Sequence, residues 1–249
     1  MLLADTRNPS ARAMHDAIAP HLDLDALPDD LHVIIGGDGW MLACIQKHGP
    51  APTYLGLNGG HLGFLHNDVK DPAAVCEMIM AGAWRAWPFP RLSMTAWSPD
   101  GTVVSGTAVN DIYVERMTGQ TARIRLRIGG VMVVEQMVCD GLITATALGS
   151  TAYSFSAGGV PCHPLVPGIH VTPICPHAPR LSPFVLPLDE VVEVEILRHE
   201  HRPVRAVSDG IDHGPVVRMT VGTAPEPATI AFLEGRHFTE TMIRKVLKS

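Results

Sequence analysis

The segment Gly36, Gly37, Asp38 and Gly39 has the residue types and spacing best suited to chemistry. It follows the apolar run 31–35, and a helical pattern starts directly after it. Glycines permit positive φ and close approach of a phosphate, and the N–H groups at a helix start favour anions. A carboxylate among them would repel phosphate, so we expect Asp38 to hold a metal or accept a proton. The alternative is a tight strand-to-helix turn with Asp38 as the helix N-cap.

Two polar or glycine-rich segments further along the chain are candidates for nucleotide binding. The run 58–65 contains three glycines and Phe64, whose ring can stack on a base or lie in the core. Asn110 and Asp111 precede an apolar strand. An amide beside a carboxylate can bind the hydroxyls of a ribose, or the pair can form an Asx turn.

Two more carboxylates, Asp140 and Asp209, are each followed by glycine next to an apolar run. The run after Asp140 leads into residues 149–151, Gly-Ser-Thr, at the start of a short helical pattern. Small hydroxyl residues with free N–H groups can hold a polar ligand. These segments indicate further binding positions without defining the ligand.

The pattern before residue 90 is typical of an α/β domain. Continuous apolar runs predict buried strands at 31–35 and 53–57, after a short strand at 1–4. Helical patterns cover 11–22 and a segment that starts at Asp71-Pro72 and ends near residue 81.

After residue 90 the pattern changes to short alternating strands. Residues 123–128 and 192–196 alternate strictly, and Gly129-Gly130 predicts a two-residue hairpin. We expect a β-sandwich here, with the arginines of the first run facing solvent. A final helix over 238–247 returns to the first domain. The predicted domains are 1–90 plus about 226–249, and 91–225.

Composition excludes several classes of protein. The 249 residues are 46% hydrophobic and 18% charged, with a net charge of −6, which argues against a nucleic-acid binder. No apolar run is long enough to span a bilayer, and the five cysteines form no Cys-x-x-Cys pair. We therefore expect a cytoplasmic protein with no membrane or nucleic-acid partner. Cys162-His163 and Cys175-Pro176-His177 lack a second pair at zinc-site spacing, so we expect no metal bound by these cysteines and histidines.

Five motifs in order resemble those of the NAD kinase family, enzymes that make NADP with ATP or polyphosphate. The matching positions are Gly36 to Gly39; Asn58, Gly60, Gly63, Phe64 and Leu65; Gly149 to Tyr153 with Gly158 and Gly159; Thr172 to His177; and Asp209 with Gly210. The resemblance implies an N-terminal α/β domain, a C-terminal β-sandwich that binds NAD, and a homodimer or homotetramer.

The resemblance also implies roles for individual residues. Asp38 would be the general base for the adenosine-ribose 2′-hydroxyl of NAD. The donor phosphates would lie against Gly36, Gly37 and Gly39, accompanied by Mg²⁺ or another divalent ion. The implied NAD contacts are Gly39, Phe64, Asn110, Asp111, Asp140, Thr151, Ala152, Tyr153 and Asp209.

Three departures from the family pattern bear on substrate affinity and donor choice. Asp111 replaces the usual glutamate, Leu148 replaces a small or hydroxyl residue, and Ser182 stands where arginine is usual. Two alternatives remain: a non-catalytic nucleotide-binding homologue, and a lipid or sugar kinase, whose relatives share Gly-Gly-Asp-Gly but lack Gly-Ser-Thr-Ala-Tyr.

Overall fold

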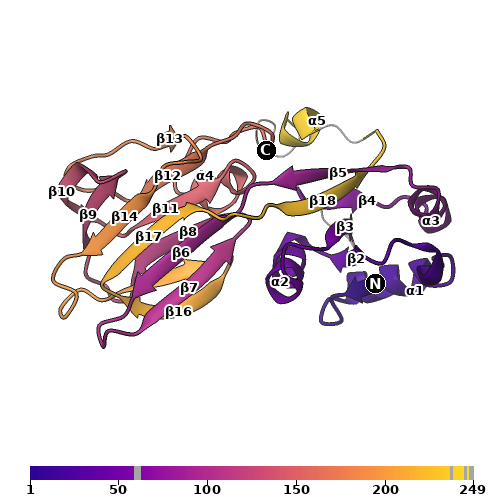
Figure 1. The fold of residues 1–249 in the computed structure, drawn as a ribbon, viewed down its shortest axis with the longest axis horizontal. Coiled ribbons are helices and arrows are strands. Elements are labelled where there is room, and N and C mark those ends of the chain that lie inside the picture. Colours follow the sequence, from indigo (N-terminus) through magenta and orange to yellow (C-terminus); the bar gives the residue numbers. More distant parts are fainter. Residues whose placement is uncertain (59–62, 236–237, 244–245, 247–249) are drawn as a thin grey trace. The chain divides into compact units, whose positions relative to one another are not determined.

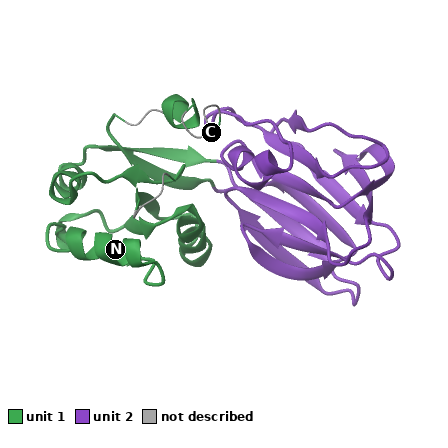
Figure 2. Ribbon diagram, turned by 180° about the vertical axis from the view of Figure 1, so that it is seen from behind, with its two compact units in different colours: residues 1–89, 227–249 green, residues 90–226 purple. Residues whose placement is uncertain are grey.

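The computed structural model describes residues 1–58, 63–235, 238–243 and 246, and the chain forms two compact units (Figure 2). Unit 1 comprises residues 1–89 and 227–249, and unit 2 comprises residues 90–226. Within the described ranges, no helix has the length and apolar character needed to cross a bilayer.

Unit 1 is built on a six-stranded, mainly parallel sheet (Figure 1). Its strand order is β1-β2-β3-β18-β5, and β4 pairs with β3. Only β5 runs antiparallel to its neighbour β18. The strands are β1 (Leu2–Ala4), β2 (Leu31–Gly36), β3 (Thr53–Asn58), β4 (Asn67–Asp68), β5 (Trp84–Phe89) and β18 (Ala228–Leu233).

The helices of unit 1 begin and end at recognisable signals. In α3 (Pro72–Met80), the Asp71 carboxylate accepts from two backbone N–H groups, and Gly82 after the helix has φ +71°. The helix expected at 11–22 is instead α1 (Pro9–Ile18). The Asn8 side chain caps its start, and Pro20, which has no backbone N–H to continue the helix, follows the C-cap Ala19.

One face of this sheet forms the core of unit 1 with α1 and α3. Val33, Leu55 and Leu57 pack there against residues such as Ile18 and Ile79. The helix α2 (Asp38–His48) lies on the other face, where its Met41 reaches Gly56. Another helix, α5 (Phe238–Met242), begins with Phe238, whose ring packs edge-on against Trp87, Phe89 and Phe232. The rest of the helix expected over 238–247 lies partly outside the described residues.

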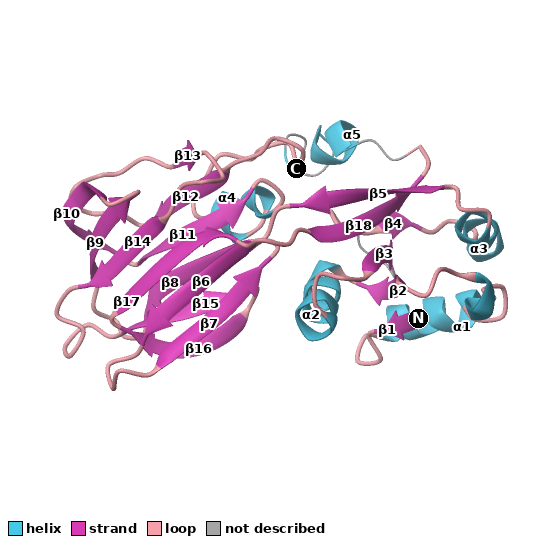
Figure 3. Cartoon of the chain, in the orientation of Figure 1, coloured by secondary structure: helices cyan, strands magenta, loops and turns pink. Residues whose placement is uncertain are grey.

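Unit 2 is a sandwich of two six-stranded antiparallel sheets (Figure 3). The first has the order β10-β9-β14-β17-β6-β7 and the second β13-β12-β11-β8-β15-β16. The strands are β6 (Leu92–Trp97), β7 (Val103–Ala108), β8 (Asp111–Arg116), β9 (Ala122–Ile128), β10 (Val131–Cys139), β11 (Gly141–Thr146), β12 (Ile169–Ile174), β13 (Phe184–Leu186), β14 (Val192–Ile196), β15 (Val204–Ser208), β16 (Ile211–Val216) and β17 (Arg218–Thr223).

Alternation along the strands fills the sandwich. Ile124 and Leu126 are fully buried between the sheets, whereas Arg125 between them reaches Glu195 on the outer face. Gly129 and Gly130, with φ +53° and +79°, form the expected turn between β9 and β10. The predicted class, an α/β domain plus a β-sandwich, is confirmed.

Candidate active site

Asp38 is the first residue of α2, directly after the buried strand β2. Gly37 occupies the N-cap position and, as a glycine, has no side chain with which to cap the helix. The N-cap alternative for Asp38 is therefore wrong. Its carboxylate instead turns toward a segment 26 to 28 residues further along the chain.

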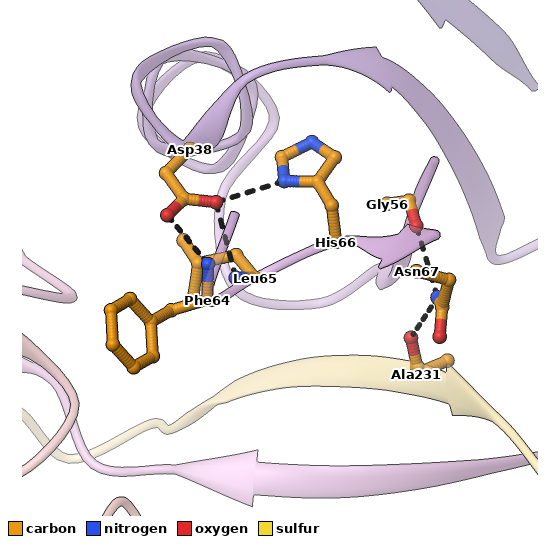
Figure 4. Close-up of polar contacts among 7 residues, drawn as sticks. All are labelled: Asp38, Gly56, Phe64, Leu65, His66, Asn67 and Ala231. Atoms are coloured by element: carbon orange, nitrogen blue, oxygen red, sulfur yellow. Dashed lines mark hydrogen bonds and ion pairs between the residues drawn. The ribbon is translucent and has the colours of Figure 1, made fainter. Parts of the chain in front are cut away.

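Three donors hold the Asp38 carboxylate (Figure 4). The Phe64 N–H donates to Oδ2 at 2.7 Å, and the Leu65 N–H donates to Oδ1 at 3.1 Å. The His66 Nδ1 lies 3.0 Å from the same Oδ1. Burial by itself would raise the pKa of Asp38, but the hydrogen bond and attraction from His66 and the two backbone donors outweigh it and lower the pKa. Asp38 is thus held as a carboxylate.

The glycines around Asp38 differ in what they allow. None of Gly36, Gly37 and Gly39 has the positive φ that glycine permits. A Cβ at Gly36 would lie 2.9 Å from Trp40 Cδ1, so this buried glycine serves helix packing. A Cβ at Gly37 or Gly39 would meet no atom of the described residues within 4 Å. Open space beside these two residues, at a helix start, suits a phosphate.

The second glycine segment meets Asp38 through its backbone. Gly63 must be glycine because a Cβ there would overlap the Asp38 Oδ1. Leu65 is buried and Phe64 is half-buried, so the Phe64 ring is not part of a closed core. Residues 59–62, including the Gly60 of the sequence motif, lie outside the described residues.

Asn67 anchors this segment to the sheet. Its Nδ2 donates to the Gly56 carbonyl at 2.9 Å and to the Ala231 carbonyl at 3.4 Å (Figure 4). Its Oδ1 accepts from the Leu233 N–H at 2.9 Å. The side chain is 3% exposed. Asn67 therefore ties the residues that hold Asp38 to β3 and β18.

In unit 2, Asp209 organises the predicted ribose-binding pair. Its carboxylate accepts from the N–H groups of Val109 at 2.7 Å, Asn110 at 3.0 Å and Asp111 at 3.2 Å. Asp209 has φ +43° in the turn between β15 and β16, and its own N–H donates to the Asp111 carbonyl. The structure thus brings Asn110, Asp111 and Asp209 together, with Asp209 as the residue that shapes the turn.

Asp111 is buried, with a relative exposure of 6%. Burial, and secondarily the charge of Asp209, raises the pKa of Asp111 to about 7. Near neutral pH this carboxyl exists in both forms, so it can donate as well as accept a hydrogen bond.

The Gly149–Tyr153 segment packs directly on this turn. A Cβ at Gly149 would overlap the Asn110 carbonyl oxygen, so only glycine permits the contact. Thr151 ends the 3-10 turn η2 (Gly149–Thr151), and Ala152 joins it to α4 (Tyr153–Ser156). The Tyr153 ring meets Tyr113 edge-on with centroids 5.0 Å apart. Leu148 is 4% exposed, so its side chain is buried in the protein.

Asp140 lies elsewhere on the same sheet. Residue 141 is opposite Glu115 and residue 145 is opposite Asp111, so Asp140 and Asp111 are at opposite ends of the β8–β11 pair. The Asp140 carboxylate is 2.7 Å from the Arg116 Nε. Asp140 thus shares no turn with Asn110, Asp111 and Asp209.

No group of three His, Cys, Asp or Glu side chains suitable for a metal occurs among the described residues. Asp38 does not offer an open set of oxygens either, since N–H donors contact both of them. Mg²⁺ typically binds phosphate oxygens with only one or two carboxylates. The described residues therefore do not form a metal cage of their own.

Sequence reasoning missed three residues of this arrangement: His66, Asn67 and Arg116. His66 and Asn67 directly follow the recognised 58–65 segment, and a polar His-Asn pair entering a short strand was the available signal. Arg116 gave no signal, because its partner Asp140 is 24 residues away and the pairing depends on the sheet.

Comparison with known proteins agrees with this architecture. Residues 109–230 match the model of the ATP-NAD kinase C-terminal domain. The chain is 34% identical over 232 residues to the NAD kinase of Brucella suis, covering 92% of this chain and 88% of that one. It is 32% identical over 250 residues to the NAD kinase of Xylella fastidiosa, and the match covers 97% of this chain and 92% of that one.

Solved structures give the same result. An NAD kinase from Archaeoglobus fulgidus in complex with ATP superposes with a TM-score of 0.79 and 25% identity, covering all of this chain and 98% of that one. Yeast NADH kinase complexed with NADH also superposes with a TM-score of 0.79. It is 27% identical to this chain, and the match covers 90% of this chain and 67% of the yeast chain. From these similarities over nearly its full length, the chain belongs to the NAD kinase family.

Proposed function

We propose that this protein transfers a phosphoryl group from ATP or polyphosphate to the adenosine-ribose 2′-hydroxyl of NAD, producing NADP. The observation that carries the proposal is the Asp38 carboxylate, held by three donors at the start of α2 beside open space at Gly37 and Gly39. The relatives named NAD kinase, and the ATP and NADH complexes of the structural neighbours, support the choice of substrates.

In this reaction Asp38 accepts the proton of the 2′-hydroxyl while that oxygen forms its bond to the transferred phosphorus. The bond from phosphorus to the bridging oxygen of the donor breaks, and the donor leaves with that oxygen. Phosphoryl transfer needs positioning more than a strong base, because its transition state is loose. A carboxylate with a lowered pKa is therefore adequate.

We place NAD in unit 2, with its adenosine ribose at the turn formed by Asn110, Asp111 and Asp209 and packed by Gly149. Thr151, Ala152 and Tyr153 extend the binding surface on this unit. Gly39, Phe64 and Asp140 stay predicted NAD contacts. A divalent ion enters with the donor phosphates, since the described residues form no cage for it. A homodimer or homotetramer stays a prediction.

The test is NADP formation by the purified protein with Mg²⁺ and NAD, comparing ATP with polyphosphate. Asp38→Asn should lower kcat about 10²- to 10⁴-fold, the loss expected for a positioned general base. NAD affinity, measured by calorimetry, should stay within twofold and shows that the variant is folded. Asp16→Asn, an exposed aspartate on α1 with 82% of its side chain accessible, is the control. Full activity of Asp38→Asn would refute the assignment; NAD binding without turnover in the wild type would indicate the non-catalytic homologue.

A further inference from the structure

His66 is the only side chain among the described residues that hydrogen-bonds to the Asp38 carboxylate. It has no exposed surface, whereas 31% of the Asp38 side chain is accessible. A carboxylate can only accept hydrogen bonds, so the bond between them places a proton on the His66 Nδ1. The imidazole lies beside the carboxylate (Figure 4) and approaches it from the protein interior, whereas part of the Asp38 side chain stays accessible.

The backbone provides the space for this pair. A Cβ at Gly56 on β3 would lie 2.7 Å from the His66 Cδ2, and a Cβ at Gly63 would overlap the Asp38 Oδ1. Each glycine therefore makes room for one member of the pair. His66 is fixed in turn by its neighbour Asn67, which is bonded to β3 and β18.

The contacts divide unequally between the two carboxylate oxygens. An ionised carboxylate has about four acceptor positions, two on each oxygen. Leu65 N–H and His66 Nδ1 use both positions on Oδ1, whereas Phe64 N–H uses one on Oδ2. Among the contacts of the described residues, one position on Oδ2 is left for an incoming hydroxyl.

We infer that His66 is a positioning residue of the phosphoryl transfer: it closes Oδ1 and directs the substrate hydroxyl to Oδ2 of Asp38. The inference rests on the proposed role of Asp38 as the general base. Without the imidazole, Oδ1 also offers an open position and the carboxylate can rotate, so a hydroxyl can bind in geometries that do not lead to transfer. His66 also keeps the carboxylate ionised, because its hydrogen bond favours the charged form.

The test compares two substitutions of His66. His66→Leu removes the donor but keeps an apolar side chain in the pocket, and we expect kcat to fall roughly 10- to 100-fold, as for other residues that orient a functional ligand. The KM for NAD should change less than twofold. The acid limb of the kcat–pH profile should move to higher pH, because Asp38 loses a bond to its charged form. His66→Asn places an amide N–H near the position of Nδ1 and should restore most of kcat and the position of the acid limb.

A double-mutant cycle separates positioning from a general structural role. If His66 acts through Asp38, the variant Asp38→Asn/His66→Leu should be no slower than Asp38→Asn alone. If the double variant instead shows the product of the two single losses in kcat, the inference is overturned. A His66→Asn variant as slow as His66→Leu would overturn it too. The control is His32→Asn, a buried histidine of the same unit on β2, whose ring contacts His48 and Tyr54. It should leave kcat and the pH profile unchanged.

Asp38→Asn alone reports on the proposed function. If it keeps full activity, the base assignment and the role of His66 both fall. If it is inactive while His66→Leu keeps wild-type kcat and pH profile, the base assignment stands and only the role of His66 is refuted.

Discussion

Replacing Asp111 with asparagine should stabilise the protein at pH 8 and do so much less at pH 5. Burial, with a smaller contribution from Asp209, raises the pKa of Asp111 from 3.8 to about 7 in the folded protein. Because the folded pKa exceeds the unfolded one, the folded state binds the proton more tightly. Stability is therefore lost as the pH rises from about 4 through 7.

The size of the effect follows from the two pKa values. Each pKa unit corresponds to about 1.4 kcal/mol. Ionisation of Asp111 thus lowers the free energy of unfolding by about 1.5 kcal/mol at pH 5 and about 4 kcal/mol at pH 8. An asparagine does not ionise, so the advantage of the variant should grow by about 2.5 kcal/mol between these pH values.

The assay is urea unfolding of wild type and variant at both pH values. Comparing the difference between the proteins at two pH values cancels any loss of packing that is independent of pH. Asp212→Asn is the control: its pKa is lowered by hydrogen bonds from the Gly214 N–H and Arg205, so folded and unfolded states are both ionised throughout this window. An advantage of Asp111→Asn that is the same at pH 5 and pH 8 would refute the reasoning. If Asp111 contacts the ribose, the same variant should raise the KM for NAD.

Two further predictions concern packing and acid sensitivity. Gly149→Ala places a Cβ against the Asn110 carbonyl oxygen and should displace the turn that contains Asn110 and Asp111. In steady-state kinetics we expect kcat/KM for NAD to fall roughly 100-fold. An unchanged kcat/KM would contradict the placement of NAD at this turn. Burial lowers the pKa of His32 and His170, so the free energy of unfolding should decrease as the pH falls below 6.5. His170→Gln should weaken that dependence in urea unfolding, and an undiminished dependence would exclude its contribution.

Local sequence patterns were sufficient for much of the fold. The apolar runs at 31–35 and 53–57 became β2 and β3, Asp71-Pro72 starts α3, and Gly129-Gly130 forms a hairpin. Each of these features depends on residues adjacent in the chain, through burial, capping or turn geometry. The bounds of α1 differ from those of the apolar pattern because the Asn8 cap and Pro9 start the helix earlier, and Pro20 follows its end at Ile18.

The sequence by itself also singled out Asp38 and the glycines beside it as the predicted centre of the chemistry, because they are unusual in type and spacing. Only the tertiary structure decided what those residues contact. The Asp38 carboxylate is held by residues 26 to 28 positions away, and Asp209 shapes a turn about 100 residues before it. Such partners follow from strand order and register, which bring distant residues together and determine how deeply Asp111 and His66 are buried. Burial and long-range hydrogen bonds shift the pKa values of Asp38 and Asp111, so the sequence can name these carboxylates as candidates but cannot give their pKa values.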